Sequence, residues 1–271
     1  MVTPVVCLTI AGSDSGGGAG IQADQKAFSA LGVFGTSAIT AVTAQNTVGV
    51  DLVHGVPPDV VDAQITAVLD DLGPLATKTG MLATAANVAA VARRAAAGEL
   101  PNLVVDPVMV ASTGASLLDE EAERTYLELL IPHAMVVTPN LYEASLLMGR
   151  TLTTVADMAD AAGFLRRVGA KVAVVKGGHL EGPVAVDVVD DGTEVRELAS
   201  PRVRTENVHG TGCTLSAATA AHLARGMAPM AAVEEAKAFV TRAIAGGSSW
   251  HLGKGHGPLD PFGWEPTGDA P

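Results

Sequence analysis

Aromatic residues and cysteines are scarce in this sequence of 271 residues. Only 3% of the residues are aromatic while 48% are hydrophobic, so the apolar content is mainly aliphatic and typical of a folded protein. The two cysteines, Cys7 and Cys213, allow one disulfide at most, which excludes a disulfide-rich secreted scaffold. A chain of this length buries enough surface to fold without disulfides or a structural metal.

Positive charge is also scarce. Lys and Arg total 17 against 29 Asp and Glu, which gives a net charge of -12 and makes nucleic acid and anionic lipid poor partners. No segment approaches the roughly 18 uncharged apolar residues of a membrane helix. The N-terminal residues lack the basic region and cleavage site of a signal peptide. We therefore expect a soluble cytoplasmic protein.

Short Val- and Ile-rich runs alternate with longer Ala-rich segments, a pattern typical of a mainly parallel sheet covered by helices. The predicted strands are residues 5–10, 37–43, 75–79, 103–106, 134–138 and 172–176, with an edge hairpin formed by 184–189 and 193–198 around an Asp-Asp-Gly turn. The predicted helices are residues 21–31, 58–72, 85–97, 119–131, 141–148, 155–168, 213–225 and 230–246. Without a linker or a shift in composition, the pattern predicts an α/β fold with one domain over residues 1–271.

A first glycine-rich segment, residues 12–20, follows a predicted strand and precedes a helix. It contains a loose G-x-G-x-x-A pattern, but the acidic residue expected about 20 residues further on in a dinucleotide-binding fold is missing. The segment is either a ligand-free turn or part of a binding site. Asp24, one turn into the helix, favours a binding site.

A second glycine-rich segment, residues 209–214, precedes a helix of small residues. Glycines at a helix start let backbone amides approach an oxyanion, and the helix dipole favours negative charge there. Phosphoryl transfer requires such a cradle. We expect the dipole to lower the pKa of Cys213, so that its thiol serves as a base, although a cysteine also packs well beside glycine.

Further polar residues follow strands at the same predicted edge of the sheet. Asn140 and Glu143 have the spacing of a helix capping box, and Glu143 is equally suited to lie near Mg²⁺. Lys176 ends an apolar strand before two glycines, where it is either solvated or directed toward a triphosphate. The sequence lacks a G-x-x-x-x-G-K-[ST] loop, an H-E-x-x-H motif and a G-x-S-x-G elbow, which argues against a P-loop enzyme, a zinc hydrolase and a serine hydrolase.

The motifs together resemble the hydroxymethylpyrimidine/phosphomethylpyrimidine kinases of thiamine biosynthesis, which belong to the ribokinase-like superfamily. The resemblance covers residues 5–258, and its motifs are residues 11–24, 40–47, 106–109, 138–140, 176–179, 209–218 and 253–258. It implies a three-layer α/β/α fold, a homodimer, and the use of ATP with Mg²⁺. It also implies two successive phosphorylations, first of 4-amino-5-hydroxymethyl-2-methylpyrimidine and then of its monophosphate.

The resemblance also implies residue roles. The catalytic residues are Cys213 as the base, with Gly210 and Gly212 beside it. The residues implied in substrate binding are Gln45, Asp24, Gly12, Thr43 and Met81. Those implied in ATP binding are Lys176, Asn140, Thr211 and Gly212, and those implied near the metal are Glu143 and Asp106. The amide of Gln45 both donates and accepts, as an aminopyrimidine edge requires.

Two other functions remain open on the sequence. Pyridoxal kinases of the same superfamily share the cysteine variant of the glycine motif, so this motif does not settle the substrate. A non-catalytic pyrimidine-binding protein would keep the fold without the chemistry. The intact residues around Cys213 and Lys176 argue against such a protein.

Overall fold

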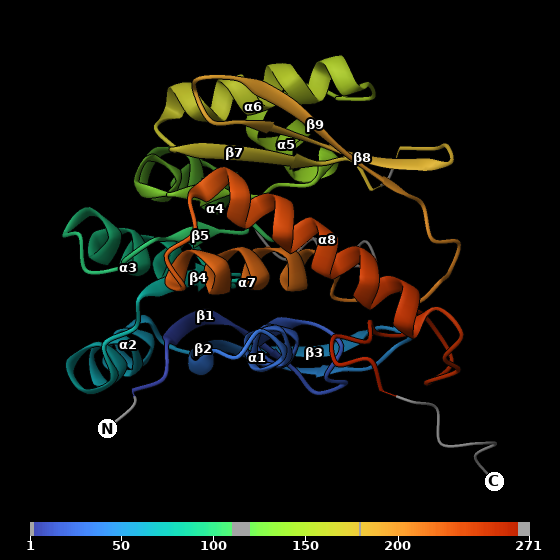
Figure 1. Ribbon diagram of the computed structural model, residues 1–271. Coiled ribbons are helices and arrows are strands. Elements are labelled where there is room, and N and C mark those ends of the chain that lie inside the picture. Colours follow the sequence, from blue (N-terminus) through green and yellow to red (C-terminus); the bar gives the residue numbers. More distant parts are fainter. Residues whose placement is uncertain (1–2, 110–119, 179, 265–271) are drawn as a thin grey trace, which may run out of the picture.

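A computed structural model describes residues 3–109, 120–178 and 180–264. In this part of the chain, nine strands form one sheet in the order β3-β2-β1-β4-β5-β6-β7-β8-β9 (Figure 1). Six neighbouring strands are parallel: β1 (Val6–Asp14), β2 (Phe34–Gln45), β4 (Ala76–Thr79), β5 (Val104–Val105), β6 (Val136–Val137) and β7 (Val172–Lys176). Three antiparallel strands lie at the two edges: β3 (Val50–Gly55), β8 (Val184–Asp190) and β9 (Val195–Pro201).

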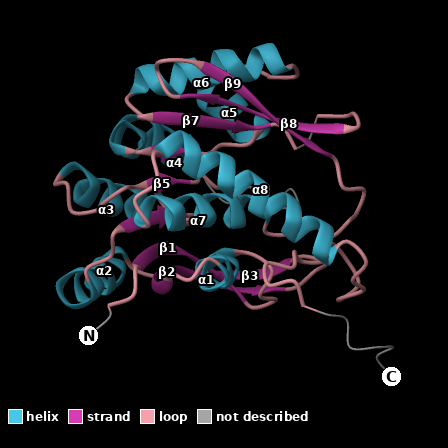
Figure 2. Ribbon diagram, viewed as in Figure 1, coloured by secondary structure: helices cyan, strands magenta, loops and turns pink. Residues whose placement is uncertain are grey.

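Helices cover both faces of the sheet (Figure 2). Three helices pack in the core of one face: α1 (Gly20–Ala30), α7 (Thr211–Ala224) and α8 (Pro229–Gly247). The other core contains residues of α2 (Pro58–Leu72), α3 (Ala85–Ala96), α5 (Leu141–Met148) and α6 (Val155–Val168). The segment α4 (Glu120–Thr125), η1 (Tyr126–Leu130) and η2 (Ile131–His133) leads into β6. The predicted three-layer α/β/α arrangement is confirmed.

The alternation of strand side chains explains why both faces are buried. Val104 packs in the core of α1, α7 and α8, whereas the next residue, Val105, packs in the opposite core. Val136 and Val137 divide in the same way. Because successive side chains point to opposite faces, a strand covered by helices on both sides must be apolar at every position.

Most predicted elements are confirmed, including the edge hairpin of β8 and β9. The antiparallel strand β3 was missed because its residues are largely exposed and carry no apolar alternation. The predicted helix 119–131 is divided, and Tyr126 and Leu130 of the π-helical turn η1 pack in the same core as Ile131 of η2. Pro132 lacks the N–H that a longer helix would need.

Some predictions fall on residues outside the described ranges. Residue 119, the predicted start of the fourth helix, and His179, the last residue of one motif, are among them. The organisation of residues 1–271 as one domain stays a prediction. Among the described residues, no helix has both the length and the apolar character that crossing a membrane requires.

Candidate active site

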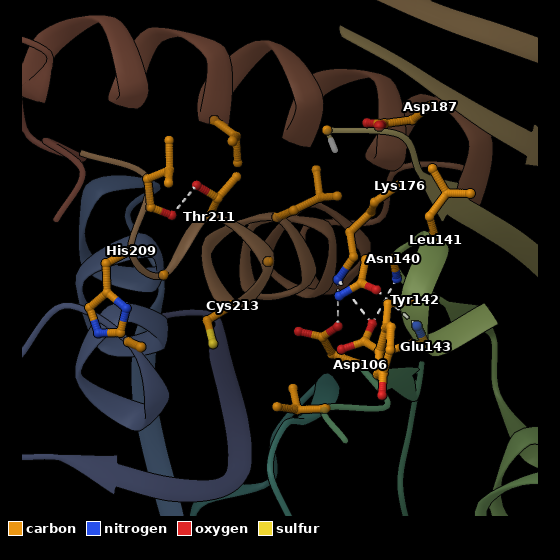
Figure 3. Close-up of a pocket in the computed structure, with 18 of the residues that line it drawn as sticks. Asp106, Asn140, Leu141, Tyr142, Glu143, Lys176, Asp187, His209, Thr211 and Cys213 are labelled. Carbon is orange, nitrogen blue, oxygen red and sulfur yellow. Dashed lines mark hydrogen bonds and ion pairs between the residues drawn. The ribbon is translucent and has the colours of Figure 1, made fainter. Parts of the chain in front are cut away.

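A cavity of about 1690 Å³ lies where the parallel strands end (Figure 3). The carboxyl ends of parallel strands meet along one edge of such a sheet, so the residues that follow them are brought together from distant positions in the sequence. All but one of the predicted site residues line this cavity: Gly12, Thr43, Gln45, Met81, Asp106, Asn140, Glu143, Lys176, Gly210, Thr211, Gly212 and Cys213. The exception is Asp24.

The amino end of α7 forms one wall of the cavity. The helix begins at Thr211, two residues earlier than predicted, after Gly210 in a left-handed conformation with φ of 85°. A Cβ at Gly210 would collide with the carbonyl oxygen of Gly18, so both the backbone conformation and the close approach require glycine. The amides of Gly212 and Cys213 are in the first turn and therefore lack an acceptor within the helix. They are suited to bind an anion.

Cys213 lies in this first turn and lines the cavity (Figure 3). The backbone amide of Gly20, the first residue of α1, donates a hydrogen bond to the thiol. Burial nevertheless raises the pKa of Cys213 to about 11. The prediction of a lowered pKa is therefore wrong for the protein without ligands, because the loss of hydration outweighs the helix dipole and the Gly20 amide.

Lys176 lies across the cavity at the end of β7 (Figure 3). Its Nζ is 2.8 Å from Oδ1 of Asp106 and 3.9 Å from Oε2 of Glu143. Burial on its own would lower the pKa of Lys176, but the two carboxylates raise it above its ordinary value. The ammonium group therefore stays charged, and its side chain keeps 13% of its surface exposed toward the cavity. It is placed to neutralise a bound phosphate.

Asn140 and Glu143 form the predicted capping box. The Glu143 amide donates to Oδ1 of Asn140 at 2.9 Å, and the Asn140 amide donates to Oε2 of Glu143 at 2.7 Å. Because the same Oε2 lies near Lys176, the cap also holds the Glu143 carboxylate at the cavity. Burial raises the pKa of Glu143 to about 7, against the opposing effect of Lys176.

The donor atoms near Lys176 suit a hard cation. Among the described residues, no group of three or more His, Cys, Asp or Glu side chains is arranged to hold a metal alone. Mg²⁺ is usually bound by one or two carboxylates together with substrate phosphates and water, and it prefers oxygen ligands. Asp106 and Glu143 provide two carboxylates beside one ammonium and therefore fit Mg²⁺ bound together with a nucleotide.

The opposite part of the cavity contains the residues predicted to bind a ring. The Thr43 hydroxyl donates to the backbone oxygen of Ser13 at 2.9 Å and lies 3.2 Å from Oε1 of Gln45. A Cβ at Gly12 would collide with the Cε of Met81, so the methionine side chain lies directly over the glycine. Gln45, Thr43, Gly12 and Met81 are thus brought together as predicted, with an amide beside an apolar surface.

Asp24 is located differently from the prediction. Its side chain is fully buried on α1, outside the cavity lining, and its Oδ2 is 2.8 Å from Nζ of Lys78. The Thr9 hydroxyl donates to the same oxygen at 2.6 Å. The partners of the carboxylate are thus Thr9 on β1 and Lys78 on β4, so in this structure Asp24 contacts Lys78 and does not line the cavity.

Three polar residues of the site were not predicted. Nε2 of His209 is 2.9 Å from Oδ2 of Asp14 and 3.3 Å from Nε2 of Gln45. Asp14 also accepts hydrogen bonds from the amides of Gly16, Gly18 and Ala19. Burial would raise the pKa of Asp14, but His209 and the amides of Ala19 and Gly16 hold it below its ordinary value. The third, Lys78, is on β4 and contributes to the lining of the cavity.

The sequence contained partial signals for all three. Asp14 and Lys78 are among the polar residues at strand ends, and His209 begins the second glycine-rich segment. The pairing of Asp14 with His209 links residues that are 195 positions apart, which no local spacing reveals. The pairing therefore becomes visible only when both glycine-rich segments meet at Gly18 and Gly210.

Comparison with known proteins agrees with this geometry. A family profile described as phosphomethylpyrimidine kinase matches residues 14–260. A hydroxymethylpyrimidine/phosphomethylpyrimidine kinase of Rhizobium meliloti is 49% identical over 261 residues, covering 95% of this chain and 97% of its own length.

Solved structures give the same fold. A pyridoxal kinase from Staphylococcus aureus in complex with AMP-PCP and pyridoxal has a TM-score of 0.88 at 36% identity, with 97% of this chain and 95% of that chain covered. A phosphomethylpyrimidine kinase from Clostridium difficile has a TM-score of 0.78 at 40% identity, with 89% and 99% covered. With the profile match over most of its length, this chain belongs to the phosphomethylpyrimidine kinase family.

Proposed function

We propose that this protein uses ATP with Mg²⁺ to phosphorylate 4-amino-5-hydroxymethyl-2-methylpyrimidine and then its monophosphate, for thiamine biosynthesis. The observation that carries the proposal is the amino end of α7. Thr211 and Cys213 at this end line the cavity, and Cys213 lies between His209 and Lys176 (Figure 3). Such a wall can hold a transferable phosphate beside an alcohol.

In the proposed complex, Gln45 hydrogen-bonds the edge of the pyrimidine and Met81 packs against the ring. Both side chains line the same part of the cavity as Gly12, whose missing side chain leaves room for Met81. A neutral amide is cheaper to desolvate than a charged group and both donates and accepts, so analogues without the amine should bind poorly.

The transfer then needs a proton acceptor and charge stabilisation. The alcohol oxygen forms a bond to the γ-phosphorus while the bond from that phosphorus to the bridging oxygen breaks, and ADP leaves. The alcohol proton passes to the sulfur of Cys213, which must be a thiolate at that moment and has therefore first released its own proton to solvent. Amides of Gly210 to Cys213, with Thr211 and Gly212 at the helix start, stabilise charge on the transferred group. Lys176 and Asn140 bind the remaining phosphates.

Mg²⁺ would be held by Asp106 and Glu143, directly or through water, and when bound it would neutralise phosphate charge. Other residues hold these two carboxylates in position. The Nζ of Lys176 is 2.8 Å from Oδ1 of Asp106, and the backbone amide of Asn140 donates a hydrogen bond to Glu143. In the second reaction the acceptor is a phosphate monoester, which is already an anion near neutral pH. We therefore expect this step to depend less on Cys213.

A pyridoxal kinase is the alternative within the same fold. The Staphylococcus aureus pyridoxal kinase overlaps the backbone well, but the Rhizobium meliloti pyrimidine kinase has the higher sequence identity. Backbone similarity therefore does not separate the two substrates, and sequence similarity favours the pyrimidine.

We also propose a homodimer in the cytoplasm. Strand β3 leaves one edge of the sheet unpaired within the described chain, with Leu52 and Val53 exposed on β3 and Val42 exposed on β2. Exposed apolar residues at a strand edge favour contact with a second copy. Two free thiols, Cys7 and Cys213, suit a reducing compartment.

The decisive experiment measures turnover with ATP and Mg²⁺, using the pyrimidine alcohol, its monophosphate and pyridoxal in parallel. We expect Cys213→Ala to lower kcat for the first phosphorylation by about 10² to 10⁴-fold and the second by less, because only the first needs a base. Cys7→Ala is the matched control, since Cys7 lies in the core outside the cavity.

Near-normal turnover of Cys213→Ala would reject the base assignment. Preferred turnover of pyridoxal would support the alternative, and binding of the pyrimidine without ATP consumption would indicate a non-catalytic binding protein.

A further inference from the structure

A chain of hydrogen-bonding side chains runs along the ring-binding part of the cavity. It consists of Asp14, His209, Gln45 and Thr43, and all four residues line the cavity. Asp14, His209 and Thr43 are buried. Because buried polar groups need partners of the opposite hydrogen-bonding role, the donors and acceptors of this chain can be assigned from its two ends inward.

Asp14 fixes the position of a hydrogen on His209. The carboxylate accepts hydrogen bonds from three backbone amides, those of Gly16, Gly18 and Ala19. Against the effect of burial, hydrogen bonds from His209 and from two of these amides hold the pKa of Asp14 below its ordinary value, so the carboxylate is ionised and can only accept. Since its Oδ2 is 2.9 Å from Nε2 of His209, this ring nitrogen must carry a hydrogen and donate it.

Thr43 fixes the other end. Its hydroxyl has a single hydrogen, which it donates to the backbone oxygen of Ser13 at 2.9 Å. Toward the Gln45 amide, 3.2 Å away, the Thr43 oxygen can then only accept. The amide of Gln45 therefore lies between an N–H donor on His209, at 3.3 Å, and an acceptor oxygen on Thr43.

These two neighbours determine which end of the Gln45 amide belongs on which side. With Nε2 toward His209 and Oε1 toward Thr43, two donors face each other and two acceptors face each other. A half turn of the amide exchanges its oxygen and its nitrogen while the rest of the site stays in place, because the two ends have nearly the same shape. Both contacts then become hydrogen bonds, from His209 to the amide oxygen and from the amide nitrogen to Thr43.

We propose that His209, held by Asp14, is a positioning residue that fixes the Gln45 amide in this orientation and makes the site specific for an aminopyrimidine over the corresponding pyrimidinone. The inference rests on the proposed function, in which Gln45 binds the edge of the pyrimidine. Gln45 lines the cavity, and each end of its amide keeps one further hydrogen-bonding site, a lone pair on oxygen and a hydrogen on nitrogen. The exocyclic amine of the substrate donates to the oxygen on the His209 side, and the adjacent ring nitrogen accepts from the nitrogen on the Thr43 side.

The pyrimidinone presents the opposite pattern. In this 4-oxo analogue a carbonyl replaces the amine, and the adjacent ring nitrogen carries a hydrogen. An amide that turned freely would follow the exchange by a half turn, but His209 and Thr43 hold the amide of Gln45 in one orientation. Two oxygens and two N–H groups would then face each other, and leaving buried polar groups unpaired is costly.

The test compares the aminopyrimidine alcohol with its 4-oxo analogue, by calorimetry without ATP for Kd and by steady-state kinetics with ATP and Mg²⁺ for kcat/KM. We expect the wild-type protein to prefer the amine by at least about 100-fold in both measurements. His209→Phe keeps a ring without the N–H and should reduce this preference by about 10-fold or more. His251→Phe is the matched control, because His251 is exposed and outside the cavity lining, and it should leave the preference unchanged.

Thr43→Val keeps the test decisive if His209→Phe does not fold. It removes the acceptor on the other side of the amide, retains the shape of the side chain and should reduce the same preference by about 3 to 10-fold. A residue with only a structural role would weaken the binding of both compounds equally. An unchanged preference in His209→Phe or, where that variant does not fold, in Thr43→Val overturns the inference.

Nuclear magnetic resonance of the protein without ligands gives a second measurement that needs no activity. The nitrogen shifts of the histidine rings show which ring nitrogens carry hydrogens, and the signals missing in His209→Phe or shifted in Asp14→Asn identify His209. We expect a hydrogen on Nε2 of His209. An Nε2 without a hydrogen overturns the inference, since it would accept from the Gln45 amide.

The outcomes also separate this inference from the proposed function. A protein that phosphorylates neither compound, yet carries the hydrogen on Nε2 of His209, would reject the proposed function and support the order of hydrogen bonds in the free site. Phosphorylation of the amine with an unchanged preference in the variants would reject the role of His209 alone.

Discussion

Two lysines at strand ends differ in one respect that determines what each can do. Lys78 on β4 and Lys176 on β7 each place Nζ 2.8 Å from a carboxylate, with Asp24 and Asp106 as partners. The Lys78 side chain is 0% exposed, whereas that of Lys176 is 13% exposed and opens on the cavity. The same local pattern thus yields one enclosed charge and one that a ligand can reach.

The number of carboxylates strengthens this contrast. Lys176 has a second carboxylate, Glu143, at 3.9 Å, whereas the ion pair of Lys78 is with Asp24, which also accepts a hydrogen bond from the Thr9 hydroxyl. Removing Lys78 would leave a buried charge without its cation. Removing Lys176 would leave carboxylates that are near the cavity, and one of them, Glu143, already has a pKa of about 7 and takes up a proton readily. We therefore expect stability to depend on Lys78 and turnover on Lys176.

The largest effect should follow Lys78→Met. The uncompensated Asp24 carboxylate would cost about 3–5 kcal/mol of the free energy of unfolding, since neither water nor another cation reaches it. Urea unfolding of the two lysine variants measures the difference, and Lys176→Met should lose less than half as much. Equal losses in the two variants would show that exposure does not distinguish the pairs.

Lys176→Met should lower kcat by about 10² to 10³-fold, because it removes a cation placed against the leaving diphosphate. Steady-state kinetics with saturating ATP and pyrimidine gives the measurement. Lys171→Met is the matched control, since Lys171 is exposed just before the same strand. A similar loss of kcat in Lys171→Met would show that a change in the strand, and not the charge of Lys176, causes the effect.

The sequence alone predicts which polar residues gather in the cavity better than it predicts their partners. Twelve predicted positions line the cavity because strand order and the parallel topology follow from local apolar runs. The burial of Asp24 was not predictable, because helical spacing places it near the glycine-rich segment without showing that Lys78 lies beneath. The lowered pKa of Cys213 failed for a related reason, since local sequence reveals the helix dipole but not desolvation.

The fold shows the same limit at its edges. Buried strands such as β7 were located to the residue, because both faces are covered and every side chain before Lys176 is apolar. Strand β3 was missed since its pairing with β2 depends on the turn in which Asn46 accepts hydrogen bonds from Val48 and Gly49. The turn from Asn46 to Gly49 was the feature of the sequence that could have indicated β3.

Glu143 should make the stability of the protein without Mg²⁺ depend on pH. Its pKa rises from 4.5 to about 7 on folding, so its contribution is fully present below about pH 4.5 and is lost as the pH rises through 7. Glu143→Gln keeps the cap and removes the charge. We expect it to raise the free energy of unfolding by about 1–3 kcal/mol near pH 8 and by almost nothing near pH 4.

Urea unfolding at the two pH values tests this prediction for Glu143→Gln, with the exposed Glu121→Gln on α4 as control. A pH-independent difference would contradict the assigned pKa. Lys78 should differ from Glu143 in this respect. We expect the ammonium group enclosed with Asp24 to cause no such change in the free energy of unfolding between pH 4 and pH 8.

The smallest effect distinguishes the two glycines beside the lysines. A Cβ at Gly80 would be 2.6 Å from the Lys78 Nζ, and a Cβ at Gly212 would be 3.1 Å from the Lys176 Nζ. Lys176 can move toward the cavity, whereas Lys78 is enclosed, so Gly80→Ala should cost about 1–3 kcal/mol of stability and Gly212→Ala less than about 1 kcal/mol. Gly212→Ala should instead raise KM for ATP, because the methyl group occupies the start of α7. Thermal unfolding and ATP kinetics of both variants test this prediction. A larger loss of stability in Gly212→Ala than in Gly80→Ala would mean that Lys78 has room to move and is not held by its surroundings.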